Sequence, residues 1–429
     1  MLAFLGLLTI VLLLVLVMSK KLSPVVALII VPIATALIGG FTTEIVTYIT
    51  DGVKTISTTA VMFIFAILFF GILMDAGTFE PVIKRLLKAA GNDPARITVV
   101  TAILAMIVHL DGSGAVTFLV TVPAMLPLYD AIGMKRTTLA TVVALAAGTM
   151  NILPWGGPTI RAASALEVPV TELFNPILIP VICGLLAVLG IAWYLGKKER
   201  SWVNEQGQVI DSTMAIEKDI SLHRPKLIWL NTALIVISIT ALIAALAPPH
   251  VIFMIAFVIA ITVNYPNLKE QRERIDAHAK AALLMASILF AAGCFTGILK
   301  GSGMIEAMAA TAVNYIPSGI GNHLALMTGV VSMPASLLFD PDSFYFGVLP
   351  LLGTTADHFN GEAIEVARAA ILGQMTTGFP VSPLTGATFL LIGLTGVDLG
   401  DHQRKTIPWA FLVTMIMLTM SILIGAISF

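Results

Sequence analysis

The chain has 429 residues, of which 58% are hydrophobic and only 11% are charged, and its formal net charge is −1. A soluble domain usually carries roughly 25% charged residues, so a water-soluble fold of this size is excluded. The balanced charge offers no electrostatic footprint for DNA or RNA, which excludes a nucleic-acid partner. The two cysteines, Cys183 and Cys294, lie in apolar segments and can build neither a disulfide framework nor a cysteine metal site.

Apolar segments that can cross a bilayer recur along the whole chain. The first, 1–18, is followed by Lys20 and Lys21 and has no basic residue before it, an order that favours a membrane helix over a signal peptide. Nine further spans are expected at about 22–40, 56–75, 138–166, 172–196, 227–247, 250–265, 281–300, 363–398 and 406–428. Each can supply the roughly 20 residues that a span needs. The fold class is therefore predicted to be an all-α polytopic membrane protein.

Two other apolar stretches, 97–130 and 323–356, are interrupted in the middle by Asp and Gly or Pro. The positive-inside rule assigns the basic segments to the cytoplasm. These segments are Lys20 with Lys21, 84–96, Lys135 with Arg136, 197–226, 269–280, and Arg404 with Lys405. Each full span takes the chain to the other side of the membrane, whereas a re-entrant hairpin returns it to the side where it entered. The basic segments all lie on one side only if each interrupted stretch is a re-entrant hairpin. Both termini are then expected outside, and 266–280 is expected to be a cytoplasmic surface helix.

The two halves of the chain, 1–196 and 227–429, can be laid over each other, with 197–226 as a cytoplasmic linker. "FFGILMDAG" aligns with "FTGILKGSG", the hairpin string "HLDGSG" with "LFDPDS", and "PWGGPT" with "PLTGAT". Each half has five spans and one re-entrant hairpin, and an odd number of spans makes the halves inverted repeats. Inverted repeats with broken helices, here about 138–166 and 363–398, are typical of secondary transporters whose site lies near the midplane.

Carboxylates occupy both predicted hairpin tips: Asp111 in the first, and Asp340 with Asp342 in the second. A charged side chain within a bilayer costs about 2.5–3.5 kcal/mol on insertion scales, and such residues usually line an ion or substrate path. The alternative is hydrogen bonding within the turn. The same turns supply small groups that a ligand could approach closely, namely Gly112, Ser113, Gly114 and Ser343.

Arg161 follows the first helix break in a stretch that carries no other charge. A guanidinium binds a carboxylate through two parallel hydrogen bonds, so we expect Arg161 to hold a substrate carboxylate. The alternative is that its side chain extends to the interface. Further substrate contacts are expected at the two breaks, from Asn151, Trp155, Gly156, Gly157 and Thr159 in the first, and from Ser382, Thr385, Gly386 and Thr388 in the second.

His109 lies two residues before the first tip carboxylate. Histidine changes charge near neutral pH, so a role in proton movement is one interpretation and a packed core histidine is the other. Asp75 and Lys300 occupy nearly equivalent places in the two halves, where a structural or gating pair and direct coupling are both open. The sequence has no nucleotide-binding or zinc-hydrolase motif, so an ion gradient is the expected energy source, and an enzyme is not expected.

Several strings resemble one known family. "LDGSGAVTF", "NILPWGGPTIRAASAL", "FAAGCFTGIL", "VNYPNLKEQRERI" and "FDPDSFYFGVLPLL" are similar to the CitMHS family, the citrate–divalent metal/proton symporters of bacteria, essentially from end to end. The resemblance implies a homodimer in the bacterial cytoplasmic membrane. It also implies an elevator-type carrier, in which a transport domain holding both hairpins moves against a scaffold. Related sodium symporters have Ser-Asn-Thr at their hairpin tips, whereas this chain has Asp-Gly-Ser and Asp-Pro-Asp-Ser.

The resemblance implies proton-coupled uptake of citrate, with no permanent cofactor. A divalent metal of the Mg²⁺ or Ca²⁺ type would arrive with the substrate. Our hypothesis is that Asp111, Asp340 or Asp342 takes the proton or reaches the water shell of the metal. The alternatives are a sodium- or proton-coupled carrier of another di- or tricarboxylate without metal, and, less consistent with opposed hairpins, an anion channel.

Overall fold

The structure, a computed structural model, describes residues 1–19, 21–206, 222–244, 246–314 and 321–428. Every regular element within these ranges is a helix, which confirms the all-α class. Seven helices in this part of the chain are long and apolar enough to span a membrane. They are Ile45–Asp75, Pro94–Asp111, Gly114–Ile132, Val170–Arg200, Pro225–Ile243, Leu268–Gly301 and Leu399–Leu423. Shorter apolar helices cover other predicted spans, among them Pro24–Ile38 and Pro249–Asn264.

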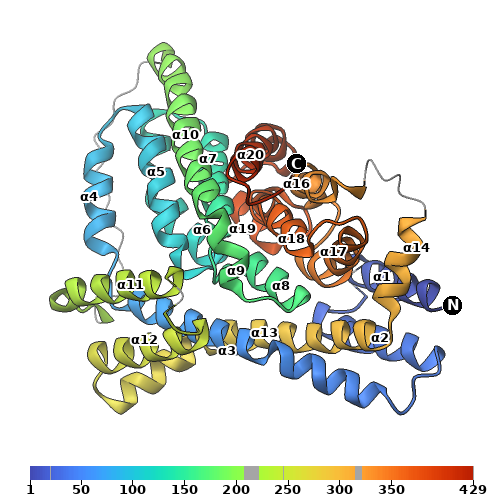
Figure 1. Cartoon of the computed structure of the whole chain (residues 1–429). Coiled ribbons are helices and arrows are strands. Elements are labelled where there is room, and N and C mark those ends of the chain that lie inside the picture. Colours follow the sequence, from blue (N-terminus) through green and yellow to red (C-terminus); the bar gives the residue numbers. More distant parts are fainter. Residues whose placement is uncertain (20, 207–221, 245, 315–320, 429) are drawn as a thin grey trace.

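The helices of the first half differ widely in length, from 5 residues in α9 to 31 in α3 (Figure 1). They are α1 (Leu2–Met18), α2 (Pro24–Ile38), α3 (Ile45–Asp75), α4 (Glu80–Ala90), α5 (Pro94–Val108), α6 (Gly114–Ile132), α7 (Arg136–Met150), α8 (Gly157–Leu166), α9 (Val170–Phe174) and α10 (Leu178–Gln206). Most of the predicted linker, 207–221, lies outside the described residues.

The second half follows a similar order. Its elements are α11 (Ile228–Ile243), α12 (Pro249–Asn264), α13 (Leu268–Gly301), α14 (Met304–Val313), α16 (Leu324–Ala335), the π-helix η5 (Ser343–Val348), α17 (Leu349–His358), α18 (Ala363–Ile371), α19 (Gly386–Thr395) and α20 (Leu399–Leu423).

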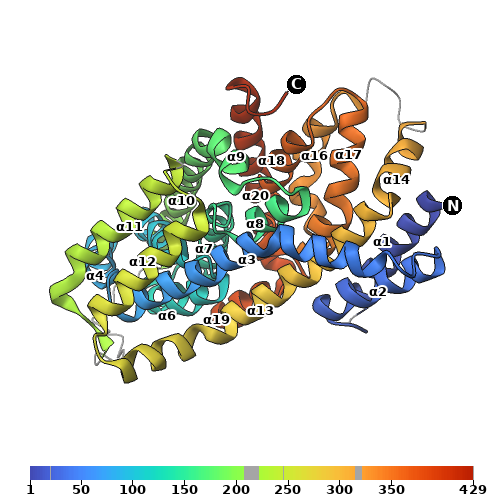
Figure 2. The same ribbon diagram turned by 60° about the horizontal axis from the view of Figure 1, so that its bottom comes forward.

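Two long helices, α3 and α13, lie side by side, beneath the other elements in the view of Figure 1, and Figure 2 shows the same pairing from another direction. With 31 and 34 residues they are about 46 and 51 Å long, well beyond the roughly 30 Å of a hydrocarbon core. The segment expected to be a surface helix, 266–280, is helical from Leu268 and mostly exposed, but it does not end before the span. It is the first part of α13, because no Gly or Pro interrupts the helix before Gly293.

Glycines allow α3 and α13 to approach backbone to backbone. A methyl group on Gly52 would lie 2.0 Å from the carbonyl oxygen of Gly293, and one on Gly297 would lie 2.3 Å from that of Tyr48. Small residues spaced four apart are the usual means by which membrane helices pack this closely. The pair can therefore act as one rigid wall within the bundle.

Both interrupted stretches turn where the acidic residues lie. In the first, α5 ends at Val108, a short 3₁₀ turn covers His109–Asp111, and α6 begins at Gly114. In the second, α16 ends at Ala335 and the π-helix begins at Ser343. Gly112 at the first tip has φ +75°, a left-handed conformation that glycine adopts without strain.

The spans expected at 138–166 and 363–398 are each divided into two helices. The first break separates α7, which ends at Met150, from α8, which begins at Gly157. The second break is longer, from the end of α18 at Ile371 to the start of α19 at Gly386, and contains the 3₁₀ turn Phe379–Val381. Each break leaves helix ends deep in the bundle.

Because α3 and α13 lie in close contact, a glycine-to-alanine substitution should destabilise the protein at Gly297 but not at Gly190. Gly297→Ala should lower the melting temperature in detergent, because its methyl group would lie 2.3 Å from the Tyr48 carbonyl oxygen and the helices would have to separate. Gly190→Ala on α10 is the control, since a methyl group there meets nothing within 4 Å. Tryptophan fluorescence during heating measures the melting temperature. Equal melting temperatures for the two variants would contradict the close contact at Gly297.

Candidate functional site

A cavity of about 490 Å³ lies between the α3–α13 wall and the elements that carry the breaks. Of the substrate and ion contacts expected from the sequence, eight line it: Asp111, Gly112, Ser113, Gly114, Asn151, Gly157, Arg161 and Thr385. Its volume falls in the range of small-molecule sites in proteins. The structure thus brings the first hairpin tip, both breaks and the guanidinium to one place.

The tip of the first hairpin combines a carboxylate with helix capping. Asp111 Oδ1 accepts a hydrogen bond from the Ser113 backbone N–H at 2.8 Å, and the Ser113 hydroxyl oxygen accepts one from Val116 N at the start of α6. Among the described residues, Asp111 Oδ2 accepts no hydrogen bond, which leaves this oxygen for a ligand in the cavity. A methyl group on Gly114 would lie 2.4 Å from the Phe379 ring, so the tip packs directly against the second break.

Arg161 forms a buried ion pair with the second hairpin. Its Nε donates to Asp342 Oδ1 at 2.7 Å, and the two side chains are only 9% and 7% exposed. No other hydrogen bond of this guanidinium is found within the described part of the chain. Since Arg161 lines the cavity, Nη1 and Nη2 are left for a ligand. A methyl group on Gly157 would lie 2.8 Å from Nη1, so glycine is needed there to make room for the guanidinium.

The other carboxylate of the second hairpin is used within its own turn. Asp340 Oδ1 accepts hydrogen bonds from the backbone N–H groups of Asp342 and Ser343, both at 3.1 Å, and Oδ2 accepts one from the Ser343 hydroxyl. Asp340, Asp342 and Ser343 are all buried and lie behind the cavity lining. Of the two alternatives left open by the sequence, the contacts of Asp340 match hydrogen bonding within the turn.

Polar side chains at the first break satisfy its backbone. The Thr159 hydroxyl donates to the carbonyl oxygen of Ile152 at 2.8 Å, and Trp155 Nε1 donates to that of Leu110 in the first hairpin tip. Asn151 Nδ2 donates to the Met375 carbonyl oxygen at 2.9 Å and so joins the two breaks. A methyl group on Gly156 would lie 2.2 Å from the Asn151 carbonyl oxygen, which explains the glycine.

The second break is closed by equivalent contacts. Hydroxyl groups of Thr385 and Thr388 both donate to the Phe379 carbonyl oxygen at 3.0 Å, and Ser382 Oγ accepts from Leu384 N. Thr388 and Ser382 are completely buried, while Thr385 also lines the cavity. Met375, a non-glycine residue, has φ +50°, a left-handed conformation that marks local strain where the breaks cross.

His109 is completely buried and has partners for both ring nitrogens. Nδ1 lies 2.8 Å from the Thr117 hydroxyl and Nε2 lies 3.5 Å from Asn151 Oδ1. These contacts fit a packed core histidine, which reaches the cavity lining through Asn151 and through the ring of Phe379, 6.4 Å away. A role for His109 in proton movement stays a prediction.

Apart from Asp75, the residues of the opposite wall of the cavity were not expected from the sequence. This wall consists of Phe63, Ile67, Gly71, Met74 and Asp75 on α3 and of His278, Ala281 and Met285 on α13. Asp75 Oδ2 lies 2.9 Å from His278 Nε2 and 3.2 Å from Arg274 Nη1. Arg274 and His278 are four positions apart, so they lie on the same face of a helix. Together with Asp75, a carboxylate at the end of an apolar segment, this spacing could have identified the cluster from the sequence.

Asp75 and Lys300 do not pair with each other. Asp75 pairs with α13 as described, whereas Lys300 Nζ pairs with Glu167 at the end of α8. No group of three or more His, Cys, Asp or Glu side chains that could hold a metal ion is found among the residues described. The metal role of Asp111, Asp340 and Asp342 is therefore still a prediction.

Comparison with known proteins agrees with this architecture. The family model CitMHS, described as a citrate transporter, matches residues 13–378. Two proteins of Bacillus subtilis (strain 168) are similar over the whole chain. "Citrate transporter" is 45% identical and covers 100% of both chains. "Mg(2+)/citrate complex secondary transporter" is 41% identical and covers 100% of this chain and 99% of its own.

The fold also matches a solved transporter. The Alcanivorax borkumensis YdaH transporter aligns with a TM-score of 0.58 at 12% identity, over 91% of this chain and 88% of its own. The structural match agrees with an all-helical multi-span fold, and the sequence matches place the chain among transporters and not among enzymes. The chain belongs to the CitMHS family of citrate transporters.

Proposed function

We propose that the chain is a secondary transporter that takes up citrate as a complex with a divalent metal, coupled to protons, by alternating access of the elevator type. The observation that carries the proposal is the cavity with Arg161 in its lining, where one guanidinium nitrogen is held by Asp342 and two remain for a ligand. A citrate transporter family and a relative named for the Mg²⁺–citrate complex support this substrate.

The ion pair prepares Arg161 to bind a carboxylate. A guanidinium offers its nitrogens in a fixed fork, and Asp342 fixes the orientation of that fork through Nε. Nη1 and Nη2 can then bind the carboxylate oxygens of citrate side by side. Thr385 and Ser113, which also line the cavity, add a hydroxyl group each. Little side-chain ordering remains when the substrate arrives, which favours affinity.

A metal complex suits the charges around the cavity better than free citrate does. Fully ionised citrate with one divalent cation keeps a single net negative charge, so the complex brings much less negative charge near Asp111 and Asp342 than the free tricarboxylate would. Asp111, in the cavity lining, would repel a free tricarboxylate but can accept hydrogen bonds from the water shell of Mg²⁺ through Oδ2. Mg²⁺ usually keeps several of its waters when it binds to proteins.

Corresponding contacts in the two halves support the proposed inverted repeats, 1–196 and 227–429. Helix α3 contacts α12 as α13 contacts α2, and α5 contacts α7 and α10 as α16 contacts α18 and α20. Thr159 and its aligned residue Thr388 both donate to a carbonyl oxygen of the preceding break. The proposal extends to a homodimer in the bacterial cytoplasmic membrane with both termini outside.

Substitution of the two ligand-facing charges should abolish uptake. Arg161→Ala and Asp111→Asn are expected to stop uptake of labelled citrate in proteoliposomes, with a loss of binding on the order of 2–5 kcal/mol for the arginine. Arg161→Lys, which keeps the charge but not the fork, should retain only a small part of the uptake. Arg272→Ala on the exposed part of α13 is the control and should transport normally. Normal uptake by the Arg161 variants would contradict the proposal.

Metal and proton dependence should appear in the same vesicles. Uptake is expected to require a divalent metal and to increase when the outside is more acidic than the inside, because both reduce the charge that crosses the membrane. Replacing sodium by choline should have no effect. Equal uptake after complete chelation would exclude the metal complex, and loss of uptake in choline would indicate sodium coupling instead.

Removing one partner of the buried ion pair should destabilise the protein. Asp342→Ala leaves the Arg161 guanidinium without its carboxylate and should cost about 3–5 kcal/mol of unfolding free energy. Asp51→Ala is the matched control, since Asp51 is 65% exposed and, among the described residues, its carboxylate pairs with Lys54, which is 73% exposed. Thermal unfolding in detergent measures both. A similar small shift for the two variants would show that the Asp342–Arg161 contact is not a buried ion pair.

A further inference from the structure

On the α3–α13 wall, Asp75 contacts both Arg274 and His278, and Asp75 and His278 line the citrate cavity. The transport mechanism proposed above gives a role to neither. Both lie next to basic segments, 84–96 and 269–280, that the positive-inside rule assigns to the cytoplasm. Resting on the proposed citrate transport, we propose that His278 is a substrate contact that exists only while the cavity faces the cytoplasm.

The cavity lies along the cytoplasmic half of the wall. Its lining residues on α3 lie between Phe63 and Asp75, in the C-terminal half of that helix. Those on α13 lie between His278 and Met285, from near the start of that helix to its middle. The two lined halves are side by side, because Asp75 contacts His278. The proposal therefore takes this structure as the state in which the substrate site faces the cytoplasm.

Asp75 determines which nitrogen of His278 is left for a ligand. Asp75 Oδ2 lies 2.9 Å from His278 Nε2, and since an ionised carboxylate can only accept, Nε2 carries the hydrogen. Arg274 Nη1 donates to the same oxygen at 3.2 Å and holds it in place. In the neutral ring Nδ1 is then an acceptor, and it has no hydrogen-bond partner among the described residues.

Gly71 supports the imidazole ring without covering Nδ1. A methyl group on Gly71 would lie between 2.6 and 2.7 Å from three consecutive ring atoms, Cγ, Nδ1 and Cε1. Nearly equal distances place this glycine over the face of the ring, whereas the lone pair of Nδ1 lies in the ring plane. The His278 side chain is 23% exposed and lines the cavity. Nδ1 can therefore accept a hydrogen bond from an O–H group of the bound complex, either the citrate hydroxyl or a water on the metal.

The aligned position in the other half of the chain has no imidazole. The alignment of the two halves pairs Gly71 with Gly297. The same offset along the chain pairs His278 with Gly52. Each glycine of the first pair packs against its counterpart in the second, backbone to ring at the cytoplasmic end of the wall and backbone to backbone at the other end. A substrate that faces the outer half of the wall therefore meets a bare glycine at the place of His278.

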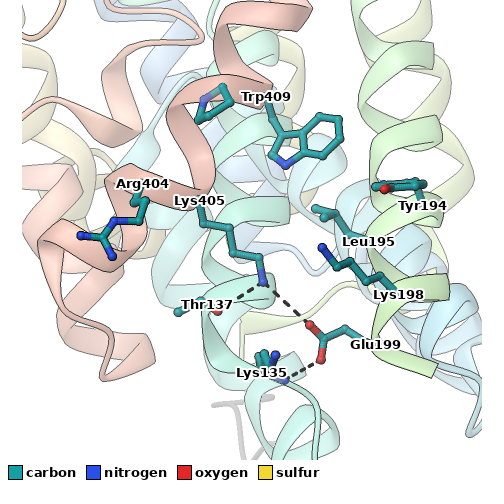
Figure 3. A pocket seen from close by; sticks show the side chains of 10 residues that line it. Lys135, Thr137, Tyr194, Leu195, Lys198, Glu199, Arg404, Lys405 and Trp409 are labelled. Carbon is teal, nitrogen blue, oxygen red and sulfur yellow. Dashed lines mark hydrogen bonds and ion pairs between the residues drawn. The ribbon is translucent and has the colours of Figure 1, made fainter. Parts of the chain in front are cut away.

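The first break belongs to a group of helices that are tied to one another. Figure 3 shows the Glu199 carboxylate of α10, which accepts a hydrogen bond from Lys135 N, just before α7, at 3.1 Å. It also accepts one from the Thr138 hydroxyl of α7 at 2.6 Å and lies 3.8 Å from Lys405 Nζ of α20. These contacts join α7, which leads into the break, to α10 and α20. His278 stays with the wall when this group moves, which limits its contact with the substrate to one state.

Exchange of labelled citrate in membrane vesicles of both orientations tests the proposal, with the Mg²⁺–citrate complex as the probe. His278→Gln keeps an N–H group for Asp75 but removes the acceptor Nδ1. Its half-saturation constant on the cytoplasmic face, measured in everted vesicles, should rise roughly 5-fold to 10-fold, the usual effect of losing one hydrogen bond. The constant on the outer face, measured in right-side-out vesicles, should not rise. His358→Gln, at an exposed position, is the control and should leave both constants unchanged.

A second variant reaches the same contact from the other helix. Gly71→Ala places a methyl group 2.6 Å from Nδ1, so the imidazole must move, and citrate binding on the cytoplasmic face should weaken in the same way. This variant tests the contact even if His278→Gln fails to fold. Competition by tricarballylate, which is citrate without its hydroxyl group, separates the two O–H groups. Weaker binding of both compounds to His278→Gln assigns the contact to a metal-bound water, and weaker binding of citrate alone assigns it to the hydroxyl group.

Two outcomes would overturn the proposal. An equal loss of affinity on both faces would show that His278 has only a structural role, and unchanged affinity on the cytoplasmic face would show that it does not contact the substrate. Absence of citrate exchange by the unaltered protein would instead contradict the proposed function, so the two failures are distinguishable.

Discussion

The helices α7 and α18 both end within the apolar bundle, where their last backbone carbonyl groups lack the hydrogen bonds of a continuing helix. Inside a membrane protein these groups must find partners in the protein itself, and the rest of the site reflects this requirement. Side chains donate hydrogen bonds to backbone carbonyl oxygens at each break. Thr159 does so at the first break, Thr385 and Thr388 do so at the second, and Asn151 links the two. Most polar side chains near the cavity are therefore already used by the backbone. The groups that remain for a ligand are few, which makes the guanidinium of Arg161 the dominant one.

Most of the carboxylates in the two hairpins are also engaged within the protein. Asp340 binds its own turn and Asp342 holds Arg161, so of the three hairpin aspartates only Asp111 lines the cavity, with one oxygen that accepts no hydrogen bond from the described residues. The three aspartates look alike in the sequence, yet their environments give them different tasks. Because a buried charge without a partner is costly, the contacts of Asp340 and Asp342 stabilise the second hairpin, while Asp111 keeps an oxygen for the proposed interaction with substrate or proton.

The sequence predicts the parts of the site that carry distinctive residues. Asp, Gly and Pro within apolar runs mark both hairpin tips and both breaks, and a lone Arg161 marks the substrate side. It does not predict the partner of Arg161, since Asp342 is 181 positions away and only folding brings the two together. It also misses the α3–α13 wall, because Phe63, Ile67 and Met285 look like ordinary lipid-facing residues. His278 was not identified because it lies in 266–280, a segment whose many charged residues are typical of a surface helix.

The contacts of that wall bear on the proposed elevator movement, because they differ in strength from one interface to the next. Within the wall, Gly52 and Gly297 lock α3 to α13, and Asp75 pairs with α13. Between the wall and α8, the cavity separates mainly apolar side chains, and the polar contact among described residues is Lys300 with Glu167. Lys300 is 54% exposed, and an ion pair so exposed to solvent contributes about 0–1 kcal/mol. Movement of α8 along the wall thus breaks almost no strong interaction, whereas movement within the wall would break many.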